Sequence, residues 1–278
     1  MNIRPSNADQ QYQIPFVSLV PFLLMTFGLT WGLFALFIFF SEPITEIFGA
    51  VSGQHPLFIL AVWAPAIATF ILVTFHSGRE GLQRYLSRLF LWRCSPSWYL
   101  FLIFGVPLLF FGGSALKGDL FATALPFDSF QSLILALVMT IITGPVEEFG
   151  WRGLALPLLQ RKFAPIGAAL ILGIIWGFWH LPAFLLSGTP QSAWSFTPFL
   201  AGSIALSVIV TPLFNTSRGS ILLPAIFHFQ CNNPIWPDAQ PYDIFIFIVA
   251  AIVIVWLKRK TMFRKTRAVT TVIPISTS

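Results

Sequence analysis

The sequence predicts an all-α fold, a polytopic membrane helix bundle with about eight transmembrane helices and one interfacial amphipathic helix. Three observations predict it. Hydrophobic residues make up 56% of the 278 residues and charged residues only 9%, whereas a soluble globular chain carries about 25% charged residues. Apolar stretches of about 20 residues, the length that crosses a bilayer, recur along the chain. The basic residues fall in short segments between those stretches, which is typical of membrane orientation and not of nucleic-acid binding.

Eight apolar windows are the expected spans, and turn residues such as those at 215–219 separate them. The windows lie near 16–40, 57–76, 98–116, 129–148, 166–186, 197–214, 219–236 and 242–257. The first is expected to be a permanent span, because it is too long for a signal peptide and lacks a small-residue cleavage site. No internal repeat or low-complexity linker divides the sequence, so residues 1–278 are expected to form a single membrane domain.

An even number of spans places both termini on the same side, and the basic residues indicate which side. Fourteen of the sixteen Lys and Arg residues fall on the side of the termini: Arg4, Arg79, Arg84, Arg88, Arg93, Arg161, Lys162, Arg218, Lys258, Arg259, Lys260, Arg264, Lys265 and Arg267. The opposite segments hold Lys117 and six acids: Glu42, Glu46, Asp119, Asp128, Asp238 and Asp243. By the positive-inside rule the tails 1–14 and 258–278 are expected in the cytoplasm, with the plasma membrane as the location if the source is bacterial.

Residues 79–93 form the expected amphipathic helix. Helical spacing places Leu82, Leu86, Leu89 and Phe90 on one face. The basic residues Arg84 and Arg88 lie largely opposite. This pattern suits a helix on the inner membrane surface, and a connector helix packed on the protein is the alternative.

Six polar residues within the apolar stretches are the candidate functional residues: Glu147, Glu148, Arg152, His180, His228 and Asn232. Ionisable residues inside a membrane are costly, so they normally face an interior cavity and mark function. At 1.5 Å per residue, Glu147 lies about 21 Å from the basic pair at 161–162 if its helix runs on to Gln160. His180 and Asn232 each lie about 20 Å from the preceding loop. We therefore expect three helices to bring these residues to one depth, with a proline kink at Gly144–Pro145.

Helical spacing also separates the expected roles. Glu148 and Arg152 are four residues apart, which favours their pairing and leaves Glu147 free for chemistry. A carboxylate facing an imidazole, as Glu147 and His180 would, can deprotonate a water molecule. A second His with an Asn amide can stabilise the oxyanion of an attacked carbonyl. The set Glu147, His180 and His228 could instead ligate zinc, whose bound water attacks. Hydrogen bonding between helices without any chemistry is the structural alternative.

The order and spacing of these residues resemble the three motifs of the CPBP family, which comprises CAAX proteases and bacteriocin-processing enzymes related to the Ras-converting endopeptidase. The family pattern is E-E-x-x-x-R, then F-x-x-x-H, then H-x-x-x-N. Here Glu147 to Arg152 fits the first motif, and His228 to Asn232 fits the third. Trp176 to His180 fits the second with Trp in place of Phe. The resemblance covers roughly residues 130–235, the expected catalytic core.

The resemblance implies an intramembrane endopeptidase whose cavity opens to the cytoplasm. In that scheme Glu147 and His180 activate the water, and His228 and Asn232 stabilise the oxyanion. The implied substrate is a peptide or a lipidated protein C-terminus held by membrane lipid, with prenylated CAAX-type peptides among the candidates. The family has been described both as metalloproteases and as glutamate-type proteases, so a zinc cofactor stays open. A non-enzymatic immunity or scaffolding protein of the same fold, which binds a peptide in the cavity, is the competing hypothesis.

Overall fold

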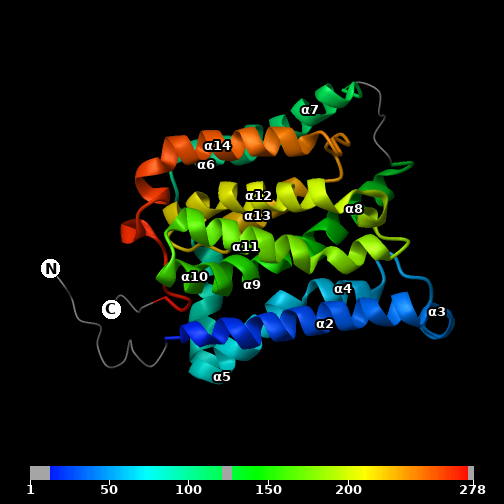
Figure 1. Ribbon diagram of the computed structural model, residues 1–278, viewed down its shortest axis with the longest axis horizontal. Coiled ribbons are helices and arrows are strands. Elements are labelled where there is room, and N and C mark those ends of the chain that lie inside the picture. Colours follow the sequence, from blue (N-terminus) through cyan, green and yellow to red (C-terminus); the bar gives the residue numbers. More distant parts are fainter. Residues whose placement is uncertain (1–12, 121–126, 275–278) are drawn as a thin grey trace.

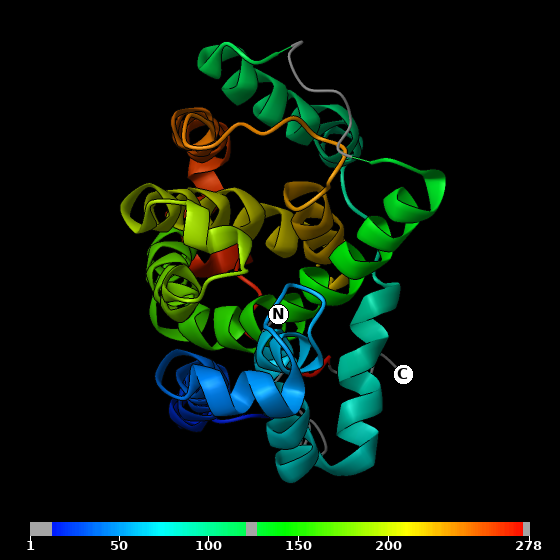
Figure 2. The ribbon, with the colours of Figure 1, turned by 90° about the vertical axis from the view of Figure 1, so that its right-hand side faces the viewer.

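The computed structural model describes residues 13–120 and 127–274. Within these ranges the chain forms helices and connecting segments and no β-strand, which confirms the all-α fold class. Most helices run side by side along the long axis of the molecule (Figure 1). Seen along that axis they form one helix bundle (Figure 2). The predicted tail 1–14 lies, apart from its last two residues, outside the described part of the chain.

The N-terminal part of the bundle is built around α2 and α5, which pack against each other. Its helices are η1 (Phe16–Ser18), α2 (Leu19–Phe39), α3 (Ser41–Phe48), α4 (Pro56–Val62), α5 (Ala64–Leu86), η2 (Ser87–Phe90), α6 (Pro96–Leu100), the π-helical η3 (Phe101–Gly105) and α7 (Val106–Lys117). The predicted span at 57–76 is broken, because α4 and the helix that follows bend by 54° at Trp63. Segments α6, η3 and α7 run on from one another as one apolar helix.

The C-terminal part contains the closely packed helices α11, α12 and α14. Its helices are α8 (Phe130–Thr143), η4 (Pro145–Glu147), α9 (Glu148–Gly150), the π-helical η5 (Trp151–Ala155), α10 (Leu156–Lys162), α11 (Pro165–Trp179), η6 (Leu181–Leu185), η7 (Pro190–Ala193), α12 (Phe196–Thr216), α13 (Leu222–Cys231), α14 (Asp243–Met262) and η8 (Lys265–Arg267).

One helical segment, Phe130–Lys162, carries the first motif through the bundle. It changes from α-helix to a 3₁₀ turn at Pro145, where the proline has no N–H to donate to the helix ladder. The segment then runs on to Lys162, so the expectation that Glu147 and Glu148 are buried is confirmed. Its predicted end at residue 148 is too early, because apolar residues continue the helix beyond the motif.

The predicted count of eight spans is not confirmed. Five helices in the described ranges are long and apolar enough to cross a membrane, and the bent pair α4–α5 makes six. Helix α13, within the window 219–236, has 10 residues, so it covers about 15 Å of a hydrocarbon core of about 30 Å. Helix α14, in the window 242–257, has only about 21 Å of apolar helix between Asp243 and Lys258.

The predicted amphipathic segment is helical but packs on the protein. Its direction changes after Gly78, whose φ of 61° is a conformation that glycine adopts readily. Figures 1 and 2 show the segment crossing the bundle instead of running along it. Leu82, Leu86 and Leu89 contact the buried core, as a connector helix would. Phe90, expected on the same apolar face, is 80% exposed, so it does not share their contact with the core.

Arg88 contradicts the amphipathic pattern most clearly. It was expected on the polar face, but only 2% of it is exposed. Its guanidinium donates hydrogen bonds to the carbonyls of Gly153, Gly219 and Val272, at 2.6, 2.7 and 2.8 Å. These bonds replace water around the charge, so burial is tolerated. Arg88 thereby joins the helical segment Phe130–Lys162, the loop before α13 and the C-terminal segment.

The described part of the predicted tail 258–278 is not a free tail. Gln160 donates to the carbonyl of Val269, and Arg161 donates to that of Thr270. Val272 and Ile273 are buried in the core beneath this segment. The C-terminal residues therefore belong to the folded bundle up to Pro274.

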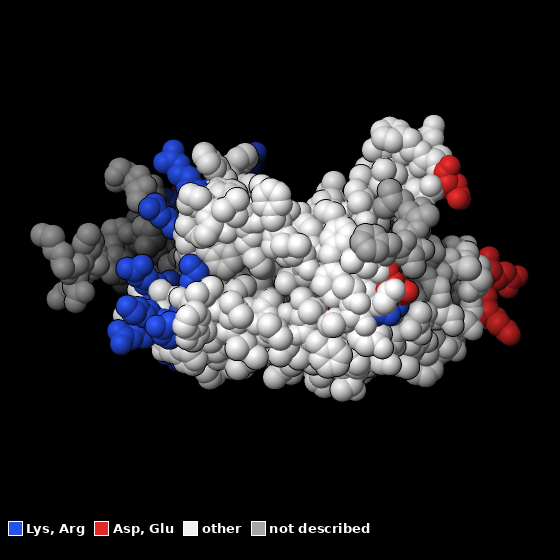
Figure 3. All heavy atoms as spheres, turned by 90° about the horizontal axis from the view of Figure 1, so that it is seen from above, with Lys and Arg blue, Asp and Glu red and all other residues white. Residues whose placement is uncertain are grey.

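Charged residues separate to the two ends of the molecule. Figure 3 shows the Lys and Arg side chains gathered at one end and most Asp and Glu side chains at the other. We call these the basic end and the acidic end. The basic end includes Lys258, Arg259 and Arg264, and the acidic end includes Glu42 and Glu46 of α3. This is the separation that the positive-inside rule predicts for a membrane protein.

Candidate active site

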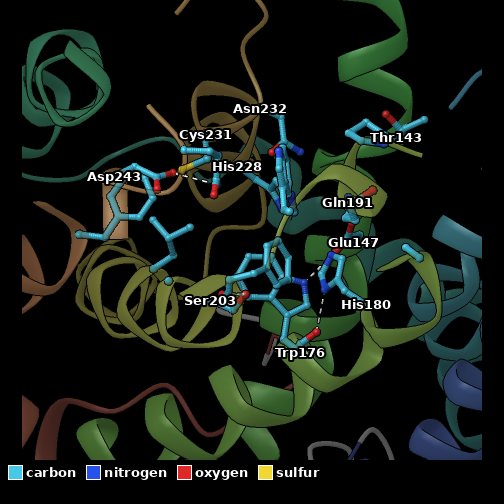
Figure 4. A pocket seen from close by; sticks show the side chains of 18 of the residues that line it. Thr143, Glu147, Trp176, His180, Gln191, Ser203, His228, Cys231, Asn232 and Asp243 are labelled. Atoms are coloured by element: carbon cyan, nitrogen blue, oxygen red, sulfur yellow. Dashed lines mark hydrogen bonds between the residues drawn. The ribbon is translucent and has the colours of Figure 1, made fainter. Parts of the chain in front are cut away.

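All six predicted site residues line one cavity of about 450 Å³. They come from the helical segment Phe130–Lys162, from the end of α11 and from the end of α13. Figure 4 shows Glu147, Trp176, His180, His228 and Asn232 around this cavity. The expected convergence of three helices is therefore found. Most of the remaining lining is apolar or aromatic, with Phe34, Phe58 and Phe199 among the residues that contribute.

Glu147 and His180 are both oriented by Trp176. The indole Nε1 of Trp176 donates a hydrogen bond of 2.8 Å to Oε2 of Glu147. The Nδ1 atom of His180 lies 2.8 Å from the carbonyl oxygen of Trp176. A carbonyl oxygen only accepts, so Nδ1 carries the proton and Nε2 of a neutral His180 keeps its lone pair. The backbone of the preceding turn thus selects the tautomer in which Nε2 can accept a proton.

Glu148 forms a buried ion-pair network with two partners. Oε1 of Glu148 lies 3.1 Å from Nη1 of Arg152, as the four-residue spacing predicts. The same oxygen lies 2.7 Å from Nδ1 of His228, a contact that the sequence did not indicate. Glu148 and Arg152 are 2% and 1% exposed, so this network is screened from water. Glu148 therefore holds two helices together and orients the His228 ring.

Gly144 allows the third motif to approach the first. A Cβ atom at this position would lie 2.6 Å from Nδ2 of Asn232 and 3.4 Å from Nε2 of His228. Real Cβ atoms do not approach other atoms as closely as 2.6 Å. Nδ2 of Asn232 and Nε2 of His228 thus both lie next to the backbone of Gly144, the residue before Pro145. Glycine at 144 was predicted as part of a kink, and this packing role was not.

Trp176, which the sequence indicated only as the first residue of the second motif, contacts several of the candidate residues. Its ring lies 5.5 Å, between centroids, from the rings of both His180 and His228. The guanidinium carbon of Arg152 lies 4.8 Å from the indole centroid, within the range of a cation–π contact. The family motif has Phe at this position, and the change to Trp was the signal that could have identified this role. Trp has a side-chain N–H to donate, whereas Phe has none.

Glu147, His180 and His228 do not fit a zinc site in this arrangement. Among the described residues, no group of three or more His, Cys, Asp or Glu side chains lies close enough together to hold a metal ion. Hydrogen bonds engage Oε2 of Glu147 and the Nδ1 atoms of the two histidines, so Oε1 of Glu147 and the two Nε2 atoms are the atoms left to bind a metal.

Two comparisons with known proteins cover this site. Residues 129–233 match the family model described as type II CAAX prenyl endopeptidase Rce1-like. The chain is also 27% identical, over 267 residues, to CAAX prenyl protease 2 of Methanococcus maripaludis. That alignment covers 88% of this chain and 95% of the relative. The matched segment contains all three motifs and every residue of the candidate site.

The similarity thus extends beyond the motifs to most of the chain, and it falls on the segment that the motifs had singled out. Together with the apolar helices of the bundle, it supports an integral membrane protein of the protease class. Residues 129–233 are similar to the Rce1-like type II CAAX prenyl endopeptidases, and the resemblance drawn from the three motifs is confirmed.

Proposed function

We propose that this protein is an intramembrane endopeptidase that hydrolyses a peptide bond with a water molecule activated by Glu147 and His180. The observation that carries the proposal is the convergence of six polar residues from three helices on one mainly apolar cavity. A buried carboxylate beside a neutral imidazole and a pair of nitrogen donors are the parts that peptide hydrolysis needs.

The attacking water would lie between Glu147 and His180. Oε2 of Glu147 accepts from Trp176, which leaves Oε1 to accept a proton from water. His180 offers Nε2, because its Nδ1 is bonded to the carbonyl of residue 176. When one of these groups takes a proton, the hydroxide attacks the peptide carbonyl. The same proton then passes to the leaving nitrogen. The elements of one water molecule are thereby added across the peptide bond, which gives a carboxyl group and an amine.

His228 and Asn232 would hold the oxyanion that forms on the carbonyl oxygen. The amide Nδ2 of Asn232 is a donor in every protonation state. Nε2 of His228 donates when the ring is protonated, and the Glu148 carboxylate at 2.7 Å balances that charge. The two nitrogens lie beside Gly144. Preorganised donors of this kind contribute about 3 kcal/mol each to transition-state stabilisation.

The proposed substrate is the C-terminal region of a lipidated protein or a membrane-held peptide, with prenylated CAAX-type peptides as the first candidates. Two features support this. The relative from Methanococcus maripaludis is called a CAAX prenyl protease. The cavity also presents aromatic side chains, among them Trp194 and Trp236, that suit an apolar segment.

The test is an assay of the purified protein in detergent with quenched-fluorescent peptides, farnesylated and unmodified. Glu147→Gln removes the base and keeps the shape of the side chain, so cleavage should stop while thermal unfolding is unchanged. Glu46→Gln, an equivalent change on the exposed helix α3, is the matched control and should retain full activity.

Cleavage that persists in Glu147→Gln contradicts the mechanism. A chelator arm tests zinc directly, because loss of activity on chelation and its return with Zn²⁺ would establish a metal-bound water. If no peptide is cleaved by the folded protein, and a cellular phenotype survives Glu147→Gln, the immunity or scaffolding hypothesis is favoured instead.

A further inference from the structure

The backbone that carries the first motif is irregular on both sides of its carboxylates. Helix α8 ends at Thr143, the 3₁₀ turn η4 contains Glu147, and α9 is followed by the π-helical η5, which contains Arg152. Each change of hydrogen-bond spacing disturbs the pairing of backbone carbonyls at the junction. The segment is therefore held less firmly by its own hydrogen bonds than a continuous α-helix is, and neighbouring elements have to fix its place.

Trp63 binds this segment on the side that precedes Glu147. Its indole Nε1 donates a hydrogen bond of 3.0 Å to the carbonyl oxygen of Ile142. Ile142 belongs to the last turn of α8, where carbonyls have no donor within their own helix. Trp63 itself lies at the 54° bend between α4 and α5. The break in one apolar span thus supplies a hydrogen-bond donor to the break in another.

Helix α5 binds the same segment beyond its carboxylates. The hydroxyl of the fully buried Tyr85 donates a hydrogen bond to the carbonyl oxygen of Phe149. A Cβ atom at Gly153 would lie 2.9 Å from Cζ of Tyr85. A Cβ atom at Gly150 would lie 2.7 Å from the carbonyl oxygen of Pro65. Real Cβ atoms do not approach other atoms this closely, so the two glycines allow α5 to lie against the motif.

Trp63 and Tyr85 act on the backbone of the site and not on its contents. Neither side chain lines the cavity, so neither contacts a peptide held there. Both residues also lie outside residues 129–233, the segment that matches the family model. Their hydrogen bonds end on carbonyls that lie before and after Glu147 in the chain. Their contribution to a reaction is therefore to fix the backbone from which Glu147 projects.

We propose that Trp63 and Tyr85 are positioning residues, which hold the backbone of residues 142–149 so that the Glu147 carboxylate stays in place for the attacking water. The inference rests on the proposed function for its effect on the rate, and on the two hydrogen bonds for the anchoring itself. A displacement of about 1 Å in a reacting group can lower a rate about a hundredfold. Loss of one anchor should therefore reduce kcat and leave peptide binding nearly unchanged.

The test uses Trp63→Phe and Tyr85→Phe, which keep an aromatic ring and remove the hydrogen-bond donor. Trp98→Phe and Tyr99→Phe make the same two changes on α6 and are the matched controls. The indole nitrogen of Trp98 has no hydrogen-bond partner among the described residues. The hydroxyl of Tyr99 donates to the carbonyl of Trp92 instead of one in the first motif.

The first arm measures amide hydrogen exchange of the purified protein in detergent and needs no activity. We expect residues 146–150 to exchange about fivefold faster or more in both variants, while α12 keeps its protection and both controls exchange like the unmodified protein. Unchanged exchange at residues 146–150 overturns the anchoring. Faster exchange throughout the bundle also overturns it, because the two side chains would then support the fold as a whole.

The second arm measures steady-state kinetics with the cleaved peptide. Each variant is expected to lower kcat about tenfold and to change KM by less than about twofold, whereas each control keeps both constants. Faster exchange with unchanged kcat overturns the positioning role, and so does a loss that falls on KM alone. If the unmodified protein cleaves no peptide, or if Glu147→Gln retains full cleavage, the proposed function fails, and the exchange arm still decides the anchoring.

Discussion

The indole nitrogen of Trp176 donates a hydrogen bond to Oε2 of Glu147 across 2.8 Å, from α11 to the 3₁₀ turn η4. The ring also lies between the imidazoles of His180 and His228. A Phe at this position, as in the family motif, would keep the packing and lose the hydrogen bond. Trp176 is therefore a positioning residue of the proposed site, which acts through Glu147.

Trp176→Phe is expected to lower kcat about tenfold with little change in KM, because one hydrogen bond to a charged group contributes about 1.5 kcal/mol. The ring remains, so the thermal unfolding temperature should stay close to that of the unmodified protein. Trp176→Ala removes the ring as well and should lower both kcat and stability. Equal loss of stability in the two variants would show a merely structural role.

Gly144→Ala is expected to reduce kcat about a hundredfold, since the added methyl group would lie 2.6 Å from Nδ2 of Asn232 and displace a proposed oxyanion donor. Steady-state kinetics with the best peptide substrate measure this effect. Gly28→Ala is the matched control, because no atom lies within 4 Å of the methyl group there. Full activity in Gly144→Ala would place the oxyanion elsewhere.

Arg152→Ala is expected to destabilise the folded protein by about 3–5 kcal/mol, because it leaves the Glu148 carboxylate buried without its arginine partner and with only the His228 ring beside it. Unfolding in detergent and denaturant measures the difference. Lys117→Ala breaks the ion pair with Asp238, whose side chains are 26% and 60% exposed, and should cost no more than about 1 kcal/mol. Similar losses in both variants would argue against a tightly buried network.

Arg88→Ala is expected to release the C-terminal segment, since the guanidinium donates to the carbonyls of Gly153, Gly219 and Val272. Trypsin should then cleave near Arg264 to Arg267 several-fold faster than in the unmodified protein. Arg88→Lys should restore only part of the protection, because an ammonium group cannot reproduce the several N–H donors that the planar guanidinium directs at separate carbonyls. The control Arg93→Ala removes an exposed arginine nearby. Unchanged proteolysis in Arg88→Ala would exclude this anchoring role.

The helix bundle and the meeting of the six candidate residues in one cavity were predictable because they depend on composition and helical spacing. The Glu148–Arg152 pair follows from a four-residue separation on one helix, and the structure confirms it. Burial of Glu147 followed from helix rise alone. The contact between Glu148 and His228 was not predictable, because the two residues are 80 positions apart and lie on different helices.

The errors have a common cause. The pattern at 79–93 indicated an exposed Arg88, but three carbonyls from distant segments surround it. Similarly, the windows at 219–236 and 242–257 are apolar, yet the helices inside them are shorter than a span or limited by charges. Hydropathy measures the preference of a segment for lipid. It does not report where a helix ends, or which protein groups hydrogen-bond to a buried charge in place of water.

The sequence by itself determined the all-α bundle, its preference for a membrane, the segments in which basic residues gather and the six residues of the candidate site, since each depends on local composition or helical spacing. Only the tertiary structure decided that Trp176 orients Glu147, that Glu148 joins Arg152 to His228 and that Gly144 lies against Asn232 and His228. Those features arise where helices distant in sequence meet, and their packing depends on the shape of every side chain between them.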